Sequence, residues 1–238
     1  MEMPTLEYPR VYAIGDIHGR SDLLDRMVET IARDMTVRPA PEALTVVLGD
    51  YIDRGPDSRG VIERLLPNPF GMPLVPLKGN HEAMLGTFLR EPSSASGWRR
   101  WGGLETLHSY GVDVTALQRS KGYEAACKAL HTALPVRHME FFDSLKLSLS
   151  VGPYFLCHAG IRPSVPLARQ CEDDLLWIRD EFLDCKADFG KIVVHGHTPI
   201  EKPQHLHNRI NVDTGAFMTG CLTCAVLEPN EVRFLSVY

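Results

Sequence analysis

The chain of 238 residues is long enough to bury a hydrophobic core, as one large domain or two small ones, without disulfide bonds to stabilise it. Hydrophobic residues make up 44% of the sequence and charged residues 23%, which is typical of a globular protein. The formal net charge of -5 argues against broad binding of nucleic acid or anionic membranes, because both favour a basic surface.

The N-terminal stretch MEMPTLEYPR contains acids and prolines where a secretory signal has a basic start and an apolar stretch. No run approaches the roughly 20 apolar residues of a membrane span. The cysteines are scattered, which favours reduced thiols. Cys221 and Cys224 have the spacing of a redox or zinc pair, but CLTCAVLE reads as a strand and no second pair completes a zinc site. We therefore expect a cytoplasmic protein with no membrane or nucleic-acid partner.

Short apolar or β-branched segments alternate with helical patterns along the chain, which predicts an α/β protein. The predicted strands are 10–14, 44–48, 73–77, 145–151, 154–157, 191–195, 209–213, 221–227 and 231–237. The predicted helices are 21–34, 58–66 and 81–90. No repeat or low-complexity segment divides the chain, so we expect one domain over residues 1–238.

The middle of the chain interrupts this alternation. Residues 90–97, REPSSASG, read as an exposed loop, and residues 98–140 read as a mostly helical insertion beside the sheet-based body. Gly111 is expected to cap a helix at its C-terminus, and Asp57 to cap the helix that follows it.

Metal-capable side chains follow five of the predicted strands, each time beside glycine. The segments are GDIHG (15–19), GDYIDRG (49–55), GNHE (79–82), HAG (158–160) and GHTP (196–199). One such segment is compatible with an ordinary turn, but five that deliver side chains to one edge of a sheet indicate a metal centre. The candidate ligands are Asp16, His18, Asp50, Asn80, His158 and His197.

The types of these residues indicate what the centre would hold. Asp16 and His18 are two positions apart in an extended segment, so both can point at one ion, and the two oxygens of Asp50 can bridge two cations. Nitrogen and oxygen ligands without thiolate suit manganese, iron or zinc. Two ions about 3.5–4 Å apart activate water and neutralise phosphoryl oxygens, so the pattern predicts phosphoester hydrolysis.

In this order the five segments resemble the metallophosphoesterase superfamily and its phosphoprotein phosphatase branch, which includes the bacteriophage lambda and bacterial serine/threonine protein phosphatases. The similarity extends from about residue 10 to the C-terminus and includes DLLWIRDEF (174–182) and VDTGAF (212–217). It implies the calcineurin-like metallophosphoesterase fold, a two-sheet β-sandwich flanked by helices with metals at one edge. Pro199 stands where many other metallophosphoesterases have histidine, a difference that the phosphatase branch shares.

The resemblance also implies a role for each motif residue. One ion would be held by Asp16, His18 and Asp50, and the other by Asp50, Asn80, His158 and His197. His81 would protonate the leaving group and Asp53 would orient it. Arg54 and Arg179 would hold the phosphate oxygens, which suits guanidinium geometry.

These similarities predict a bacterial phosphomonoesterase with two divalent ions, most readily Mn²⁺, that acts on phosphoserine and phosphothreonine in proteins or peptides. In such enzymes a metal-bridging hydroxide attacks in line while His81 acts as general acid. The alternative is symmetrical hydrolysis of diadenosine tetraphosphate or a similar nucleotide, although that branch often has a small residue in place of Asp53. The sequence leaves the oligomeric state open.

Several other polar and aromatic residues are expected to be structural. His195 ends a predicted strand and is not counted among the ligands, and Asp213 is expected to accept backbone hydrogen bonds. Trp98 and Trp177 are expected to pack, whereas Trp101 could also line a cleft.

Overall fold

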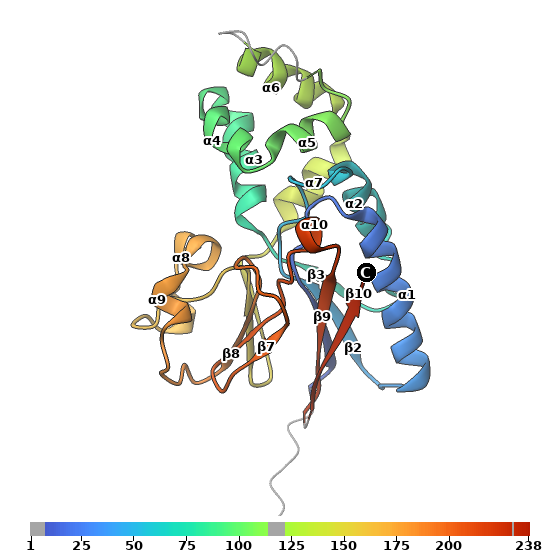
Figure 1. The fold of residues 1–238 in the computed structure, drawn as a ribbon, viewed down its shortest axis with the longest axis vertical. Coiled ribbons are helices and arrows are strands. Elements are labelled where there is room, and N and C mark those ends of the chain that lie inside the picture. The colour runs from blue at the N-terminus through green and yellow to red at the C-terminus, as the bar shows by residue number, and fades with distance from the viewer. Residues whose placement is uncertain (1–7, 114–121, 230) are drawn as a thin grey trace, which may run out of the picture.

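The computed structural model describes residues 8–113, 122–229 and 231–238 of the chain. Two five-stranded sheets pack face to face, and helices cover their outer faces and one end of the sandwich (Figure 1). This arrangement confirms the α/β sandwich that the family resemblance implied.

The first sheet has the order β10-β9-β1-β2-β3. Its strands are β1 (Arg10–Ile14), β2 (Ala43–Val47), β3 (Leu74–Pro76), β9 (Leu222–Leu227) and β10 (Val232–Val237). Strands β1, β2 and β3 run parallel, while β9 is antiparallel to both of its neighbours. The parallel strands therefore end at the same edge of the sheet.

The second sheet has the order β4-β5-β6-β8-β7. Its strands are β4 (Ser148–Val151), β5 (Tyr154–Cys157), β6 (Ile192–His195), β7 (Gln204–His205) and β8 (Arg209–Asn211). Strands β5, β6 and β8 run parallel, and the short, exposed β7 was not predicted. The predicted strand 145–151 is divided, because Lys146 bridges to Leu77 beside the first sheet and only β4 joins the second.

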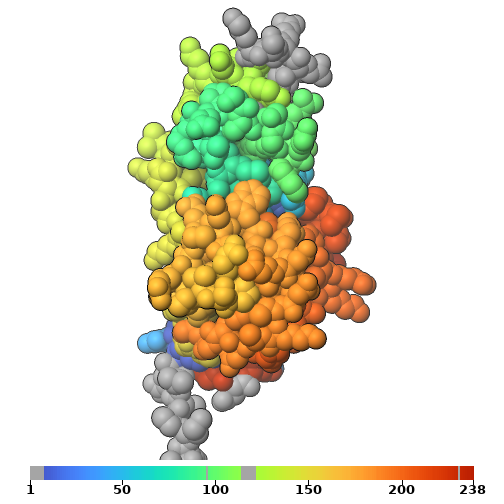
Figure 2. Space-filling model, turned by 90° about the vertical axis from the view of Figure 1, so that its left-hand side faces the viewer, coloured from blue at the N-terminus to red at the C-terminus, as the bar shows by residue number. Residues whose placement is uncertain are grey.

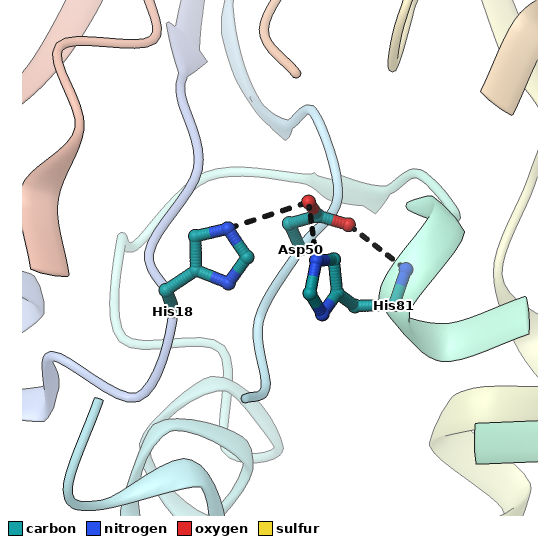
Figure 3. A group of neighbouring side chains, drawn as sticks. All are labelled: His18, Asp50 and His81. Atoms are coloured by element: carbon teal, nitrogen blue, oxygen red, sulfur yellow. Dashed lines mark hydrogen bonds and ion pairs between the residues drawn. The ribbon is translucent and has the colours of Figure 1, made fainter. Parts of the chain in front are cut away.

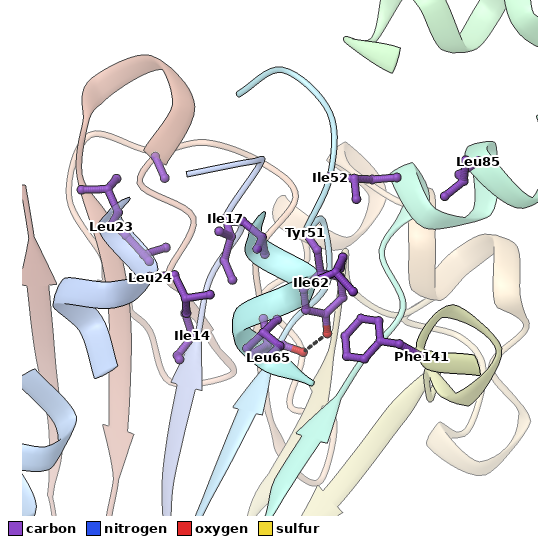
Figure 4. Close-up of a cluster of buried hydrophobic side chains, with 14 of the residues drawn as sticks. Ile14, Ile17, Leu23, Leu24, Tyr51, Ile52, Ile62, Leu65, Leu85 and Phe141 are labelled. Atoms are coloured by element: carbon purple, nitrogen blue, oxygen red, sulfur yellow. Dashed lines mark hydrogen bonds between the residues drawn. The ribbon is translucent and has the colours of Figure 1, made fainter. Parts of the chain in front are cut away.

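Alternation along β1 explains how the first sheet is buried on both faces. Val11 and Ala13 pack in the cluster between the two sheets, and Tyr12 and Ile14 pack in the cluster under the helices. In Figure 4 side chains from this strand, the loops at its end and the helices meet in that second cluster. The core thus holds the carboxyl ends of the strands in fixed positions.

Helices α1 (Ser21–Val37) and α2 (Ser58–Leu65) cover the first sheet, and α8 (Glu172–Trp177) and α9 (Asp180–Leu183) lie at the outer face of the second (Figure 1). The remaining helices are α3 (Asn80–Arg90), α4 (Ala95–Arg100), α5 (Gly103–Ser109), α6 (Gly122–Ala133), α7 (Val136–Ser144) and α10 (Ala216–Thr219). Among the residues that the structure describes, no helix combines the length and apolar character that crossing a membrane requires.

The helical insertion predicted at 98–140 is present as α4 to α7, apart from residues 114–121, which lie outside the described part of the chain. The segment predicted as an exposed loop at 90–97 is mostly exposed, but it contains a 3-10 turn (Pro92–Ser94) and the start of α4. Burial of Trp98 explains this difference, since its ring packs against Phe88 with centroids 4.8 Å apart. Such a tertiary contact overrides the local preference of the serines and glycine for a loop.

Both predicted caps are confirmed. The side chain of Asp57 accepts a hydrogen bond from the backbone N–H of Gly60 at 2.9 Å at the start of α2. Gly111 has φ 77°, and its N–H donates to the carbonyl of His108 while that of Val112 donates to Leu107. This pattern is a Schellman motif, which ends α5 where the glycine can adopt a left-handed conformation.

Candidate metal centre

The candidate ligands follow the carboxyl ends of strands in both sheets. Asp16 and His18 follow β1, Asp50 follows β2, Asn80 begins α3 after β3, His158 follows β5 and His197 follows β6. All are buried, with at most 5% of the residue exposed. The pattern alone suggested one edge of one sheet, whereas the structure brings the ends of two sheets together. In α/β proteins such a junction at strand carboxyl ends is a common place for ligands.

Asp50 lies at the middle of this group. One of its oxygens, Oδ2, is 3.4 Å from Nε2 of His18 and 3.8 Å from Nε2 of His81, and all three side chains point toward one another (Figure 3). The other oxygen, Oδ1, is 3.4 Å from Nε2 of His158. Each carboxylate oxygen therefore faces a different group of histidines, which is the geometry that bridging two cations requires.

The second group consists of Asn80, His158 and His197. The amide oxygen of Asn80 is 2.8 Å from Nε2 of His158 and 3.0 Å from Nδ1 of His197. The two imidazole nitrogens are 3.2 Å apart. With Asp50, the two histidines place their ligand atoms within the reach of one ion.

Backbone carbonyls decide which ring nitrogen of two histidines is free to bind a cation. Nδ1 of His18 is 2.9 Å from the carbonyl oxygen of Ile52, and Nδ1 of His158 is 3.0 Å from that of Leu48. Because a carbonyl only accepts, each Nδ1 carries the proton, and the lone pair of Nε2 faces Asp50. Fixing the tautomer through the second nitrogen is typical of metal-ligating histidines.

Asp16 lies beside these groups, with its carboxylate turned toward His197. It accepts the backbone N–H of His197 at 3.0 Å and 3.2 Å from its two oxygens. A Cβ atom at Gly196 would come within 2.0 Å of Oδ1 of Asp16, so only glycine allows this approach. Asp16 is thus buried next to the cluster but is not among the side chains whose ligand atoms converge.

The electrostatics of the site favour bound cations. Burial, with the neighbouring carboxyl of Glu82, raises the pKa of Asp50 well above its usual range, and burial with the carboxyls of Asp213 and Asp50 does the same to the pKa of Asp16. Burial lowers the pKa of His158 to about 3 and lowers the pKa of His197 as well. Neutral imidazoles keep their lone pairs, and divalent ions would offset the buried negative charge, so the residues fit a metal centre.

The backbone at the site is strained. Among the described residues, the non-glycine positions with positive φ are His18, Asp50, Asp53, Arg54, Asn68 and His197, and all except Asn68 are candidate site residues. Left-handed conformations of this kind cost of order 1–3 kcal/mol each and persist only where the surrounding structure enforces them. The fold therefore holds these side chains at a fixed place at the expense of local backbone stability.

His81 and Asp53 form a buried pair next to the cluster. Nδ1 of His81 is 2.7 Å from Oδ2 of Asp53, and neither residue is exposed. Nε2 of His81 has no hydrogen-bond partner and faces Asp50. Burial, together with the charge of Arg54, lowers the pKa of His81, and burial raises the pKa of Asp53 to about 7. His81 therefore lies between Asp53 at its Nδ1 and the candidate ligand Asp50 at its Nε2.

Two further residues contact Asp53, and the sequence analysis missed their role. The indole N–H of Trp98 donates to Oδ2 at 2.7 Å, and the hydroxyl of Thr106 donates to Oδ1 at 2.6 Å. Both residues belong to the helical insertion and lie far along the chain from Asp53, so no local spacing could have indicated the contact.

Arg54 and Arg179 lie near different histidines of the cluster, Arg54 near His18 and Arg179 near His158 and His197. Nη1 of Arg54 is 3.1 Å from Nε2 of His18, and its guanidinium lies over the rings of Phe217 and Trp101. Nη1 of Arg179 donates to the hydroxyl of Thr198 at 3.1 Å. Neither arginine forms an ion pair with a carboxylate in the part of the chain that the structure describes. Two cations without carboxylate partners provide a place for an anion.

His195 and Asp213 lie near the cluster but make other contacts. The ring of His195 packs edge-on against Phe182 at 5.0 Å, and burial lowers its pKa to about 3. Oδ1 of Asp213 accepts the backbone N–H of Gly215 at 2.9 Å, which confirms its predicted hydrogen bond to the backbone. Neither residue belongs to the groups of converging ligand atoms.

A groove of about 350 Å³ opens beside the site. It is lined by α3, the end of α4 and α8, and Figure 2 shows the surface of α8 and α9 (orange) directly below that of α3 and α4 (teal). Trp101 and Trp177 line it and are 47% and 40% exposed. The ring of Trp177 is 6.4 Å from that of His197, so the groove lies beside the cluster. Trp101 therefore lines a groove, as the sequence analysis allowed.

The sequence matches the family model for the calcineurin-like phosphoesterases over residues 9–232. A serine/threonine-protein phosphatase 2 from Escherichia coli is 28% identical, with 91% of this chain and 92% of the relative covered. An asymmetrical bis(5'-nucleosyl)-tetraphosphatase from Anoxybacillus flavithermus is 27% identical, with 94% and 92% covered. Relatives with two different substrates are thus similar to the chain at almost the same level.

Solved structures agree on the fold. A structure described as that of a candidate diadenosine tetraphosphatase has a TM-score of 0.64 at 21% identity and covers 97% of this chain and 94% of its own. A cold-active protein-tyrosine phosphatase from Shewanella has a TM-score of 0.57 at 17% identity, with 98% and 82% covered. At these identities the structures support the architecture alone.

Proposed function

The chain belongs to the calcineurin-like phosphoesterase family, and from this premise we propose that it is a metal-dependent phosphomonoesterase that acts on phosphoserine and phosphothreonine in proteins. The observation that supports this proposal is the convergence of two groups of ligand atoms on Asp50, with unpaired arginines beside them. A phosphate ester placed at Asp50 would meet divalent charge and guanidinium groups together.

The candidate ligands would hold two divalent ions. As the family resemblance implies, Asp16, His18 and Asp50 would hold one divalent ion, and Asp50, Asn80, His158 and His197 the second. The converging ligand atoms support His18, Asp50, His158 and His197 in these roles, and Asn80 lies against both histidines of the second group. When bound, the ions supply Lewis acidity to the phosphate and to the attacking water. Mn²⁺ fits this donor set of nitrogen and oxygen atoms, as do iron and Zn²⁺.

Arg54 and Arg179 would bind the phosphate oxygens and orient the ester for in-line displacement. His81 would hold a proton on Nε2 and transfer it to the departing alkoxide, while its Nδ1 remains bonded to Asp53. The position of Nε2, buried and without a hydrogen-bond partner in the structure, leaves it free to face a substrate oxygen.

The groove beside the site supports a peptide as the substrate. Lys78 and Glu172 form an ion pair of 2.6 Å within it, and Asp173 and Arg90 add one charge of each sign. A groove of mixed charge with exposed tryptophans suits the varied side chains of a phosphopeptide. With two basic and two acidic side chains, the groove lacks the net positive charge that would favour a tetraphosphate chain.

Hydrolysis of dinucleoside tetraphosphates is the second candidate. It is favoured by the relatives named bis(5'-nucleosyl)-tetraphosphatase, whose similarity covers 94% of this chain. These relatives are named for the asymmetrical reaction, whereas the sequence analysis considered the symmetrical one. The exposed rings of Trp101 and Trp177 could stack on nucleobases, as aromatic side chains commonly do.

A substrate panel tests the proposal. The protein would be freed of metal with a chelator, reloaded with Mn²⁺, Fe²⁺ or Zn²⁺, and given phosphoserine, phosphothreonine and phosphotyrosine peptides and diadenosine tetraphosphate. We expect the highest kcat/KM on phosphoserine or phosphothreonine peptides, with activity that depends on reloading. A higher value on the tetraphosphate would select the second candidate, and its products would identify the cleavage: two ADP if symmetrical, AMP and ATP if asymmetrical.

A further inference from the structure

The helical insertion contacts the candidate site at the buried side chain of Asp53. Oδ2 of Asp53 accepts two hydrogen bonds of 2.7 Å, one from His81 and one from the indole of Trp98. Oδ1 accepts one of 2.6 Å from Thr106. Trp98 lies on α4 and Thr106 on α5, and their exposed fractions are 3% and 0%.

The backbone of Asp53 is held by the same hydroxyl. Its N–H lies 2.9 Å from the oxygen of Thr106 and 3.0 Å from that of Ser58, and these two oxygens are 2.9 Å apart. Asp53 has a φ of 70°, which a non-glycine residue adopts only under constraint. Thr106 therefore contacts both ends of the residue, the strained backbone and the carboxylate.

These contacts are needed because the side chain of an aspartate does not fix its own orientation. The last torsion of aspartate joins an sp³ to an sp² carbon and has a broad, shallow preference. The hydrogen bond to His81 alone would let the carboxylate rotate about that torsion. Donors at both oxygens set the plane of the carboxylate, and this plane sets the direction in which it accepts from Nδ1 of His81.

The ring of Trp98 is held between α3 and the start of α5. Its ring packs on Phe88, and a Cβ atom at Gly103 would lie only 2.4 Å from it, so the start of α5 has room for this ring only because residue 103 is glycine. The carbonyl of Gly102, between α4 and α5, accepts the backbone N–H of Arg54 at 3.2 Å. The same turn thus holds the residue after Asp53.

We propose that Trp98 and Thr106 are positioning residues that orient Asp53 and, through it, the imidazole of His81. This proposal rests on the proposed function, because it assigns the orientation to the proton transfer by His81. It gives the helical insertion a direct role in the reaction, in addition to any role in substrate binding.

The main test uses Trp98→Phe, which keeps an aromatic ring on Phe88 and removes the N–H donor. We expect its kcat on a phosphoserine peptide to fall about tenfold, the effect of losing one hydrogen bond to a charged group. On p-nitrophenyl phosphate, whose leaving group is stable without a proton, we expect less than about a twofold loss. An equal loss on both substrates would overturn the proposal, because a purely structural defect does not depend on the leaving group.

Thr106 gives an independent comparison. Thr106→Val removes the hydroxyl and should reproduce the leaving-group dependence, whereas Thr106→Ser should restore the activity on the phosphoserine peptide. Thr45→Val is the matched control, because Thr45 is equally buried and its hydroxyl has no hydrogen-bond partner in the structure. We expect it to leave the ratio of the two activities unchanged. Failure of Thr106→Ser to restore that ratio would contradict the role of the hydroxyl.

A spectroscopic measurement separates this proposal from the proposed function. In the ¹⁵N-labelled protein, we expect the indole resonance of Trp98 to shift on Asp53→Asn, and the Nδ1 resonance of His81 to shift on Trp98→Phe. Both shifts should appear even if no phosphate ester is hydrolysed, in which case the proposed function fails while the coupling stands. Unchanged His81 resonances in a folded Trp98→Phe protein would show that Trp98 does not position His81.

Discussion

At the scale of single residues, Asp50 is the buried carboxylate that belongs to both groups of converging ligand atoms. Each of its oxygens faces a different group of histidines, and burial already raises its pKa well above the usual range. In the absence of cations its negative charge is uncompensated. The same carboxylate should therefore destabilise the metal-free chain and stabilise the metal-loaded one.

This reasoning predicts the behaviour of Asp50→Asn. The amide keeps the shape but loses the bridging charge, so we expect about one ion per chain or fewer in place of two, and a loss of at least about 100-fold in kcat. The metal-free variant should melt at the same temperature as the wild type or higher, while the rise in Tm on adding Mn²⁺ should shrink. Metal analysis after dialysis and thermal unfolding measure both effects. Retention of two tightly bound ions would contradict the bridging role.

The position of His81 is compatible with two roles, general acid and metal ligand, and one variant can distinguish them. Its Nδ1 is bonded to Asp53, as the proposed acid requires, but its Nε2 also falls among the ligand atoms around Asp50. In His81→Asn the loss of an acid should slow a phosphoserine peptide about 10²–10⁴-fold and p-nitrophenyl phosphate far less, with both ions retained. Loss of one ion, with equal effects on the two substrates, would identify His81 as a ligand instead.

At the scale of elements, a partly buried charge network joins α1 to the first sheet. Asp34 on α1 accepts from Tyr12 of β1 at 2.6 Å and from Arg233 of β10 at 2.8 Å. Burial opposes the charge of Asp34, but the hydrogen bonds from Arg233 and Tyr12 outweigh it and lower its pKa below the ordinary 3.8. The folded state therefore binds the ionised form more strongly than the unfolded state does.

The sign of this shift sets the pH dependence of Asp34→Asn. The contribution of Asp34 is fully present above about pH 4 and is lost as the pH falls through its lowered folded pKa. We expect the variant to lose about 2 kcal/mol of unfolding free energy at pH 7, and the difference from wild type to shrink by about pH 2.5. Urea unfolding of both proteins at the two pH values measures this difference in unfolding free energy. Asp25→Asn on the same helix, whose side chain is 52% exposed, should cost less than about 1 kcal/mol. An equal deficit for Asp34→Asn at both pH values would refute the assignment.

The elements that the sequence predicted well are those whose signal is local. Strands β1 and β5 begin and end as predicted, because each is a short apolar run buried on both faces. The start of α4 was missed, because that helix depends on Trp98 reaching Phe88 and Asp53. Strand β7 has two exposed residues and carries almost no hydrophobic signal.

At the scale of the whole molecule, the candidate ligands have a local signal in the sequence, whereas the residues that position Asp53 do not. The candidate ligands were identifiable because each follows a strand within a recognisable motif, and parallel strands bring such ends together. The contribution of both sheets followed only from the family resemblance. Trp98 and Thr106 follow no strand and share no spacing with Asp53, so only the packing of the insertion over the sandwich reveals them.

The arrangement of the insertion above α8 also bears on the choice of substrate. The groove between them is lined by Trp177 on α8 and by Trp101 at the end of α4, and Trp177 also lies beside His197 of the cluster. A phosphopeptide is long enough to enter this groove while its phosphate lies at Asp50, whereas p-nitrophenyl phosphate ends at the site. The groove should therefore contribute to binding only for the larger substrate.

Trp177→Ala tests this contribution. Removing the ring takes away apolar contact area that the bound peptide would cover, so we expect the KM for a phosphoserine peptide to rise about tenfold, with kcat within about twofold of wild type. The KM for p-nitrophenyl phosphate should not change, which controls for damage to the cluster near His197. Steady-state kinetics on both substrates measure the separate effects on KM and kcat. If the KM for diadenosine tetraphosphate rises and that for the peptide does not, the groove holds a nucleobase, and the second candidate function explains the architecture better.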